Sequence, residues 1–122
     1  MEYMFFYIGL SLLLIHEMDA IRQREWKLFI FLSSLREETA YVVFTALHIP
    51  LYILLFWGLF GDGNGINDGL VIALDCFLII HVFLHLLFIR HKDYRFTSVF
   101  SWVLILGAGI AGAVDLIIWR DR

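Results

Sequence analysis

Residues 3–20, YMFFYIGLSLLLIHEMDA, decide the fold of this chain. The stretch is almost wholly apolar until it ends in three ionisable side chains, His16, Glu17 and Asp19. On a helix, residues three apart share a face, so His16 and Asp19 lie together, and Glu17 lies about 100° further round. The stretch therefore predicts an apolar helix that ends in a cluster with the spacing of metal ligands or of a proton relay.

The rest of the chain repeats the apolar pattern. Hydrophobic residues make up 61% of the 122 residues, whereas soluble domains hold about 45–50%. A bilayer core about 30 Å thick needs roughly 20 apolar residues in a helix. Four stretches approach that length, and they predict helices over about residues 3–27, 35–60, 68–90 and 97–119. We therefore expect an all-α fold, an integral membrane antiparallel four-helix bundle with short connections, formed as a single domain by residues 1–122.

The same composition indicates the surroundings of the protein. The expected partner is the lipid bilayer, and the net charge of −3 gives no indication of a nucleic-acid partner. Protein partners cannot be read from the pattern, and a homo-oligomer stays open. No small-residue cleavage site follows the first apolar run, so we expect a retained helix rather than a removed signal peptide. The single cysteine, Cys76, lies inside an apolar stretch and predicts a buried thiol.

Basic residues are distributed unevenly over the connections. Four Lys and Arg residues lie in the first connection and three in the third, against none in the glycine-rich second connection and two at the C-terminus. Because cytoplasmic loops carry an excess of Lys and Arg, we expect the first and third connections in the cytoplasm. Both termini would then lie outside, in a multi-pass protein of the inner (cytoplasmic) membrane.

Several local patterns predict helix ends and packing. Ser34 and Glu37 have the spacing of a capping box, which places the start of the second helix near Leu35. Asn67 or Asp68 can cap the third helix. In the last helix, small residues at four-residue spacing predict a close approach of two backbones. They are Gly107, Ala108, Gly109, Ala111, Gly112 and Ala113.

Four histidines on three of the helices are expected at a similar depth. Counted at about 1.5 Å per residue from the cytoplasmic helix ends, His16, His48 and His85 lie about 6–12 Å below the boundary. His81 lies one turn deeper, on the same face as His85. Ionisable groups inside a bundle are costly and mark ion paths, relays or ligand sites. The imidazoles therefore predict a common polar site near the cytoplasmic side.

The leading interpretation of this site is an intramembrane metal centre. Imidazole is the commonest protein metal ligand, and Zn or Fe sites combine it with carboxylates. Asp75 is expected behind His81 as a hydrogen-bonding support. Catalysis stays open, with Glu17 and Asp19 as the candidate catalytic carboxylates. The expected metal ligands are His16, Glu17, Asp19, His48, His81 and His85.

Three other interpretations stay open. The histidines and Asp75 could form a proton or ion relay. Two histidines could hold a haem between helices, an interpretation that we rank below Zn or Fe. The imidazoles could also hydrogen-bond across helices in a structural or interaction protein. The sequence has no nucleotide-binding loop, nucleophile elbow, HExxH pair or cysteine metal motif, so it leaves open whether the protein is an enzyme.

Short motifs along the chain also support a comparison with known families. They are His16-Glu17-x-Asp19-Ala20, Glu25-Trp26-Lys27-x-Phe29, His48-x-Pro50, and the series Asp75, His81-x-x-x-His85 and His91. In these motifs the chain resembles, over nearly its whole length, a family of small bacterial integral-membrane proteins of unknown function with four predicted helices. The resemblance implies the four-helix membrane fold and the importance of these residues, and it brings no reaction or ligand.

Overall fold

The computed structural model describes residues 2–121, and within that range it contains helices and no strand. Four of the helices are long and apolar enough to cross a membrane. This confirms the expected all-α fold. The elements are α1 (Met4–Arg22), the short 3-10 helix η1 (Glu25–Leu28), α2 (Ile30–Ser33), α3 (Glu37–Phe60), α4 (Asp68–Phe88) and α5 (Val99–Trp119).

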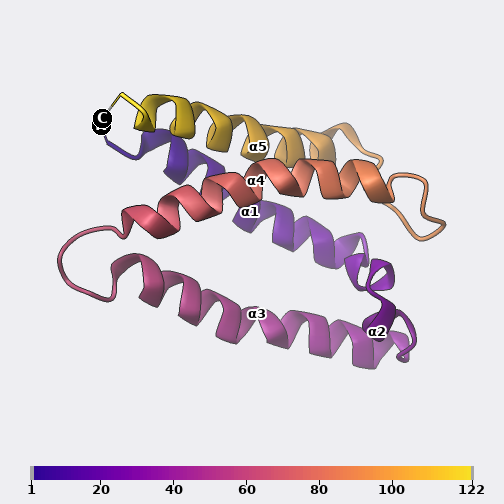
Figure 1. Ribbon diagram of the computed structural model, residues 1–122. Helices are drawn as coiled ribbons and strands as arrows, with labels where there is room; N and C mark the ends of the chain where they lie inside the picture. The colour runs from indigo at the N-terminus through magenta and orange to yellow at the C-terminus, as the bar shows by residue number, and fades with distance from the viewer. Residues whose placement is uncertain (1, 122) are drawn as a thin grey trace.

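The four long helices alternate in direction and form two unequal groups (Figure 1). Helices α1, α4 and α5 pack closely together, whereas α3 stands apart, and its few contacts are divided mainly among α4, α2 and η1. The start of α1 lies beside the end of α5, where the rings of Tyr3 and Trp119 are 6.3 Å apart. The segments 23–36 and 89–98 therefore lie at one end of the bundle, and the glycine-rich segment 61–67 lies at the other.

Small residues bring α5 close to its neighbours, as the sequence predicts. A Cβ atom on Gly112 would stand 2.9 Å from the backbone oxygen of Asp75 and 3.2 Å from the Cβ of Leu78, both on α4. A Cβ atom on Gly109 would overlap the side chain of Val82. Because only a hydrogen fits at these points, the backbones of α4 and α5 can approach closely.

The first connection differs from the expected geometry. Helix α1 ends at Arg22, short of the predicted end at residue 27, because Arg24 adopts a left-handed conformation (φ 54°) that a helix cannot continue through. The chain then turns into η1, whose Trp26 is buried against Phe44 of α3, with ring centroids 5.8 Å apart. The connection therefore folds back against the bundle end, and it places Glu25 next to the helices.

The two predicted helix caps have opposite outcomes. The prediction of a capping box is wrong. Helix α3 begins after Arg36 without a side-chain cap, and the Ser34 hydroxyl donates to the Phe31 carbonyl instead. Asn67 does cap α4, since its side-chain oxygen accepts a hydrogen bond from the Leu70 amide at 3.1 Å.

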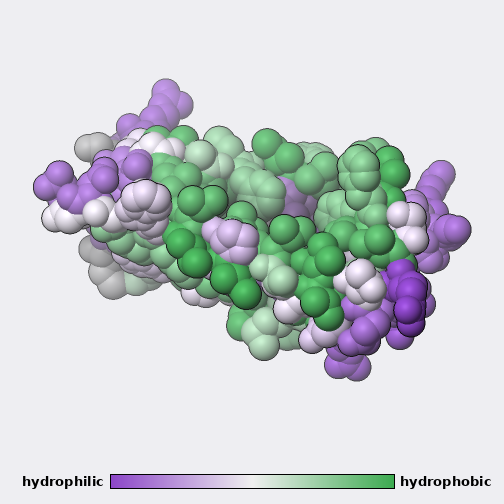
Figure 2. Space-filling view, turned by 90° about the horizontal axis from the view of Figure 1, so that it is seen from below, coloured by the Kyte–Doolittle hydropathy of each residue, from purple (hydrophilic) through white to green (hydrophobic). Residues whose placement is uncertain are grey.

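The surface of the molecule is apolar in its middle and polar at both ends. Figure 2 shows this band of hydrophobic residues between two hydrophilic ends. Helix α3 contributes most to the exposed band: only 11% of its most apolar window is buried inside the protein, against 39% for α1. A bilayer would cover this band.

The prediction for Cys76 is wrong, because this residue is exposed on the outer side of α4 rather than buried.

Candidate functional site

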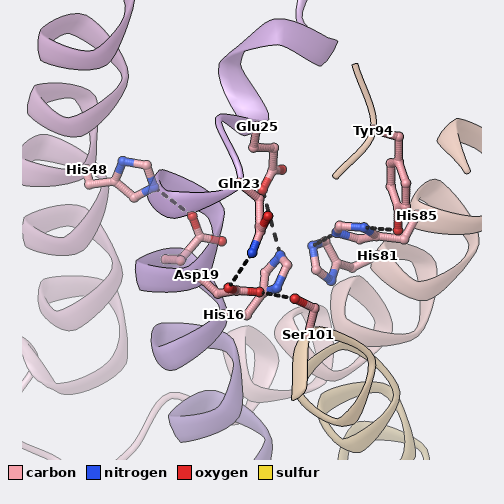
Figure 3. A network of polar contacts seen from close by, with 10 residues as sticks. His16, Asp19, Gln23, Glu25, His48, His81, His85, Tyr94 and Ser101 are labelled. Carbon is pink, nitrogen blue, oxygen red and sulfur yellow. Dashed lines mark hydrogen bonds and ion pairs between the residues drawn. The ribbon is translucent and has the colours of Figure 1, made fainter. Parts of the chain in front are cut away.

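Three histidines meet between α1 and α4, near the end of the bundle that carries segments 23–36 and 89–98 (Figure 3). His16 comes from α1, and His81 and His85 lie one turn apart on α4. One ring nitrogen of each lies within 4.8 Å of the others. All three side chains are buried, with exposed fractions of 0%, 6% and 4% respectively. We call these residues the histidine trio.

The spacing within the trio approaches that of a metal coordination shell. The Nε2 atoms of His81 and His85 are 3.2 Å apart. Two nitrogens that each lie about 2.05 Å from a tetrahedral Zn²⁺ are separated by about 3.3 Å. The third nitrogen, on His16, is somewhat further out at up to 4.8 Å. The three nitrogens are therefore close to the spacing of three corners of a tetrahedral shell, with His16 set wider than the other two.

His16 has unsatisfied hydrogen-bonding capacity. Neither of its ring nitrogens has a hydrogen-bond partner among the described residues, and the Nδ1 atom of His81 has none either. A buried polar atom without a partner costs about 1–3 kcal/mol, and more in a hydrocarbon environment. A neutral imidazole has one lone pair and one N–H group. A bound cation would therefore satisfy one of the two ring nitrogens of His16.

The segment 89–98 closes the trio from one side. The Tyr94 hydroxyl lies 3.0 Å from His85 Nδ1 and forms a hydrogen bond with it. The buried ring of Phe96 contacts His85 edge-on at 4.7 Å between centroids and lies 5.3 Å from His16. Tyr94 thus orients the His85 ring so that Nε2 faces the trio, in the way that a second group orients a metal-binding histidine.

Glu25 of η1 approaches the trio from the other side. Its Oε2 atom is 3.7 Å from His16 Nε2, longer than a hydrogen bond, and has no hydrogen-bond partner among the described residues. Burial, helped by the charges of Glu17 and Asp19, raises the pKa of Glu25 to about 8. Burial, and to a smaller extent the carboxyl of Glu25, also raises the pKa of Tyr94 to about 12.

Glu17 and His48 form a separate pair between α1 and α3. The Oε2 atom of Glu17 is 2.7 Å from His48 Nε2. The other ring nitrogen, Nδ1, donates to the Phe44 carbonyl at 2.7 Å. Because Nδ1 carries a proton, His48 and Glu17 share one further proton across the short contact. Both side chains are partly exposed, at 16% and 21%.

The remaining two predicted carboxylates lie in other contacts. Asp19 accepts hydrogen bonds from Ser101 Oγ at 2.6 Å and from Gln23 Nε2 at 3.2 Å, so it links α1 to α5. Asp75 is fully buried on α4 where Gly112 of α5 packs against its backbone. It lies about 9 Å along the helix from His81.

The structure therefore divides the predicted site residues. It brings together His16, His81 and His85, and it places Glu17 with His48 and Asp19 with Ser101. Sequence reasoning did not assign Glu25, Tyr94 and Phe96 to the site. Glu25 does stand in one of the short motifs quoted above, but no pattern of spacing links it to the histidines, because the turn after α1 brings it there.

Comparison with known proteins gives a match to a family model. The model is described as a family of unknown function (DUF6713), and it matches residues 2–122. No curated protein matches the chain, and no solved structure matches it.

Proposed function

The chain belongs to the family of unknown function DUF6713, and we propose that it is an integral membrane protein whose histidine trio binds a transition-metal ion inside the bilayer. The observation that carries the proposal is the convergence of three buried imidazoles, one of them without any hydrogen-bond partner among the described residues. Imidazoles in a structural role normally find such partners. The membrane location follows from the four long apolar helices.

The donor set favours Zn²⁺ or Fe²⁺. Three neutral imidazoles suit both ions, and three protein ligands with one open position are typical of catalytic zinc sites. Glu25 lies beside His16 and could occupy the fourth position or accept a proton from a bound water. These residues suit a catalytic metal centre, and we include a catalytic role in the proposal.

The uneven distribution of basic residues sets the proposed orientation. The trio lies at the bundle end that carries the Lys- and Arg-rich segments 23–36 and 89–98. By the positive-inside rule, this end faces the cytoplasm, so both chain ends face the opposite side of the inner membrane. The metal centre would then take its ion from the cytoplasmic side.

Metal analysis of the purified protein tests the proposal. We expect protein purified in detergent without chelator to carry a stoichiometric amount of Zn or Fe, and a visible spectrum without haem absorption. Alanine at His16, His81 or His85 should each remove most of the metal, because two remaining ligands leave an incomplete shell. A second alanine within the trio should add little, because the three act as one site.

His48→Ala is the matched control, since this histidine also lies in a long helix but outside the trio. We expect it to retain the metal, as should His91→Ala in the segment after α4. Wild-type protein without stoichiometric metal would contradict the proposal, as would equal metal loss in His48→Ala and His85→Ala.

A proton relay is the second candidate, and a specific contact favours it. The Tyr94 hydroxyl, His85 and His81 form a continuous hydrogen-bonded chain with links of 3.0 and 3.2 Å. Such chains carry protons in membrane proteins. This function predicts proton flux into vesicles that His85→Ala abolishes in protein stripped of metal, whereas a metal centre predicts loss of function on stripping.

A further inference from the structure

A groove runs along the gap between α3 and the group formed by α1 and α4. Two adjoining cavities of about 430 and 240 Å³ form it, and they share Glu17, Leu51 and Phe77 in their walls. On α3 the groove extends from Phe44 to Leu55, which is about 16 Å along the helix. It is open at the apolar surface, because α3 stands apart from the other helices (Figure 1).

The walls of the groove change from apolar to polar along its length. Most of the lining is Leu and Phe. The cavity nearer segment 23–36 also carries Glu25, His48 and His81, Glu17 lies where the two cavities meet, and Tyr52 lines the other cavity. Two polar atoms of residues in the nearer cavity, Oε2 of Glu25 and Nδ1 of His81, are buried and have no hydrogen-bond partner among the described residues. The groove therefore has the polarity of an amphiphile, with a long apolar part and a short polar end.

We propose that this groove binds one hydrocarbon chain of a single-chain lipid whose head is an uncharged hydroxyl group. A hydroxyl can donate one hydrogen bond and accept another, and the two side chains that hold these unpartnered atoms, Glu25 and His81, both line the polar end. No Lys or Arg is among the described residues that line the two cavities. The charge of a carboxylate or phosphate head would therefore have no cationic partner there.

The orientation of the groove suits a lipid that enters from the bilayer. Lipid chains run along the membrane normal, and so do α3 and α4, between which the groove lies. The polar end lies toward the bundle end that carries η1, and His81 lies about 10 Å along α4 from the end of that helix at Phe88. A lipid that enters sideways would therefore place its hydroxyl head below the headgroup layer, at the level of the polar residues.

The lipid groove and the proposed metal centre share one residue. His81 belongs both to the histidine trio and to the wall of the groove. The role of the lipid as a substrate of the metal centre rests on the proposed function. The binding of the lipid chain rests on the groove alone, so the two can fail separately.

Photolabelling tests the inference on the full-length protein in phosphatidylcholine nanodiscs. The probe is hexadecanol with a diazirine in its chain. We expect it to label peptides from α3 and α4, and we expect excess hexadecanol, but not hexadecanoate, to suppress the labelling. Leu51→Trp fills the shared part of the groove and should lower labelling about tenfold, the effect of roughly 1.4 kcal/mol in binding.

Leu54→Trp is the matched control, because Leu54 is also exposed on α3 but does not line the groove. It should label like the wild type. Leu47→Trp, at a second exposed position in the groove wall, repeats the test if Leu51→Trp does not fold. Metal content measured on the same samples should stay unchanged in the tryptophan variants, whereas His85→Ala should lose metal and keep the labelling.

Three results would overturn the inference. Equal labelling of Leu51→Trp and Leu54→Trp would mean that the probe reports the bulk bilayer. Equal competition by hexadecanoate would exclude an uncharged head. Conversion of a dimer to a monomer by Leu51→Trp would mean that a second copy of the chain fills the groove. Specific labelling of protein that lacks metal would support lipid binding in the groove and would contradict only the proposed metal centre.

Discussion

At the scale of single residues, Tyr94 decides how the His85 ring stands. The Tyr94 hydroxyl bonds Nδ1 and so leaves Nε2 to face His81 and His16. The segment that carries Tyr94 also places Phe96 over the trio. One short connection therefore contacts His85 twice, through the Tyr94 hydroxyl and through the Phe96 ring. Its position between two helices in the sequence does not indicate these contacts.

We expect Tyr94→Phe to lower metal affinity about 10–100-fold, because removing the partner that orients a metal-bound histidine has effects of that size. The ring itself, and its packing on Phe96, are kept. The measurement is metal binding by competition with a chromogenic chelator. Tyr41→Phe is the control, since the Tyr41 ring packs on Trp26 away from the trio. Equal affinities in the two variants would show that Tyr94 does not position His85.

At the scale of elements, α5 holds the bundle together by coming close to α4. The contact depends on Gly112, which faces the backbone of Asp75, and on Gly109, which faces Val82. Within this group α1 also packs against α5, and the Asp19–Ser101 hydrogen bond of 2.6 Å joins them near the trio. The position of His16 relative to α4 therefore depends on how tightly both helices pack on α5.

We expect Gly112→Ala to destabilise the fold by about 1–3 kcal/mol, because the new methyl group would meet a backbone atom that cannot move aside. Gly107→Ala is the matched control on the same helix. Its Cβ would stand 3.1 Å from the mobile end of the Leu12 side chain, so its effect should be small. Thermal unfolding in detergent measures both. If the two variants unfold at the same temperature, the close α4–α5 contact at Gly112 does not determine the stability of the fold.

At the scale of the whole molecule, the protein is polar at its two ends and apolar between them (Figure 2). The histidine trio lies off-centre, in the last two turns of α1 and α4. The end near the trio carries the basic residues of segments 23–36 and 89–98. Glu37 pairs there with Arg24 at 3.1 Å and with Lys27 at 3.5 Å, so part of this charge also ties η1 to α3.

Cysteine labelling in intact cells tests the proposed orientation. In a Cys76→Ser background, a cysteine at Asn64 in the glycine-rich segment should react with a membrane-impermeant maleimide, because that end would face outward. A cysteine at Lys92 should react only after the membrane is opened. Both positions are exposed, so accessibility alone does not separate them. The reverse labelling pattern would show that the protein has the opposite orientation in the membrane. The helix packing described above would not be affected.

The sequence by itself determined the four long helices and their all-α packing. Helix length and polarity are set by the bilayer, which requires roughly 20 apolar residues with backbone hydrogen bonds made within the segment. That requirement is local, so it can be read from consecutive residues. The depth of His16, His81 and His85 follows from the same counting, which is why the sequence could predict that they converge.

Only the tertiary structure decided which of the predicted residues share a site. Two helices at the same depth can be rotated or held apart, and α3 is held apart, so His48 pairs with Glu17 and stays outside the trio. Glu25 and Tyr94 reach the trio from connections whose turns are irregular. Depth along a helix is a property of the sequence, whereas rotation, separation and the path of a connection depend on contacts between residues far apart in the chain.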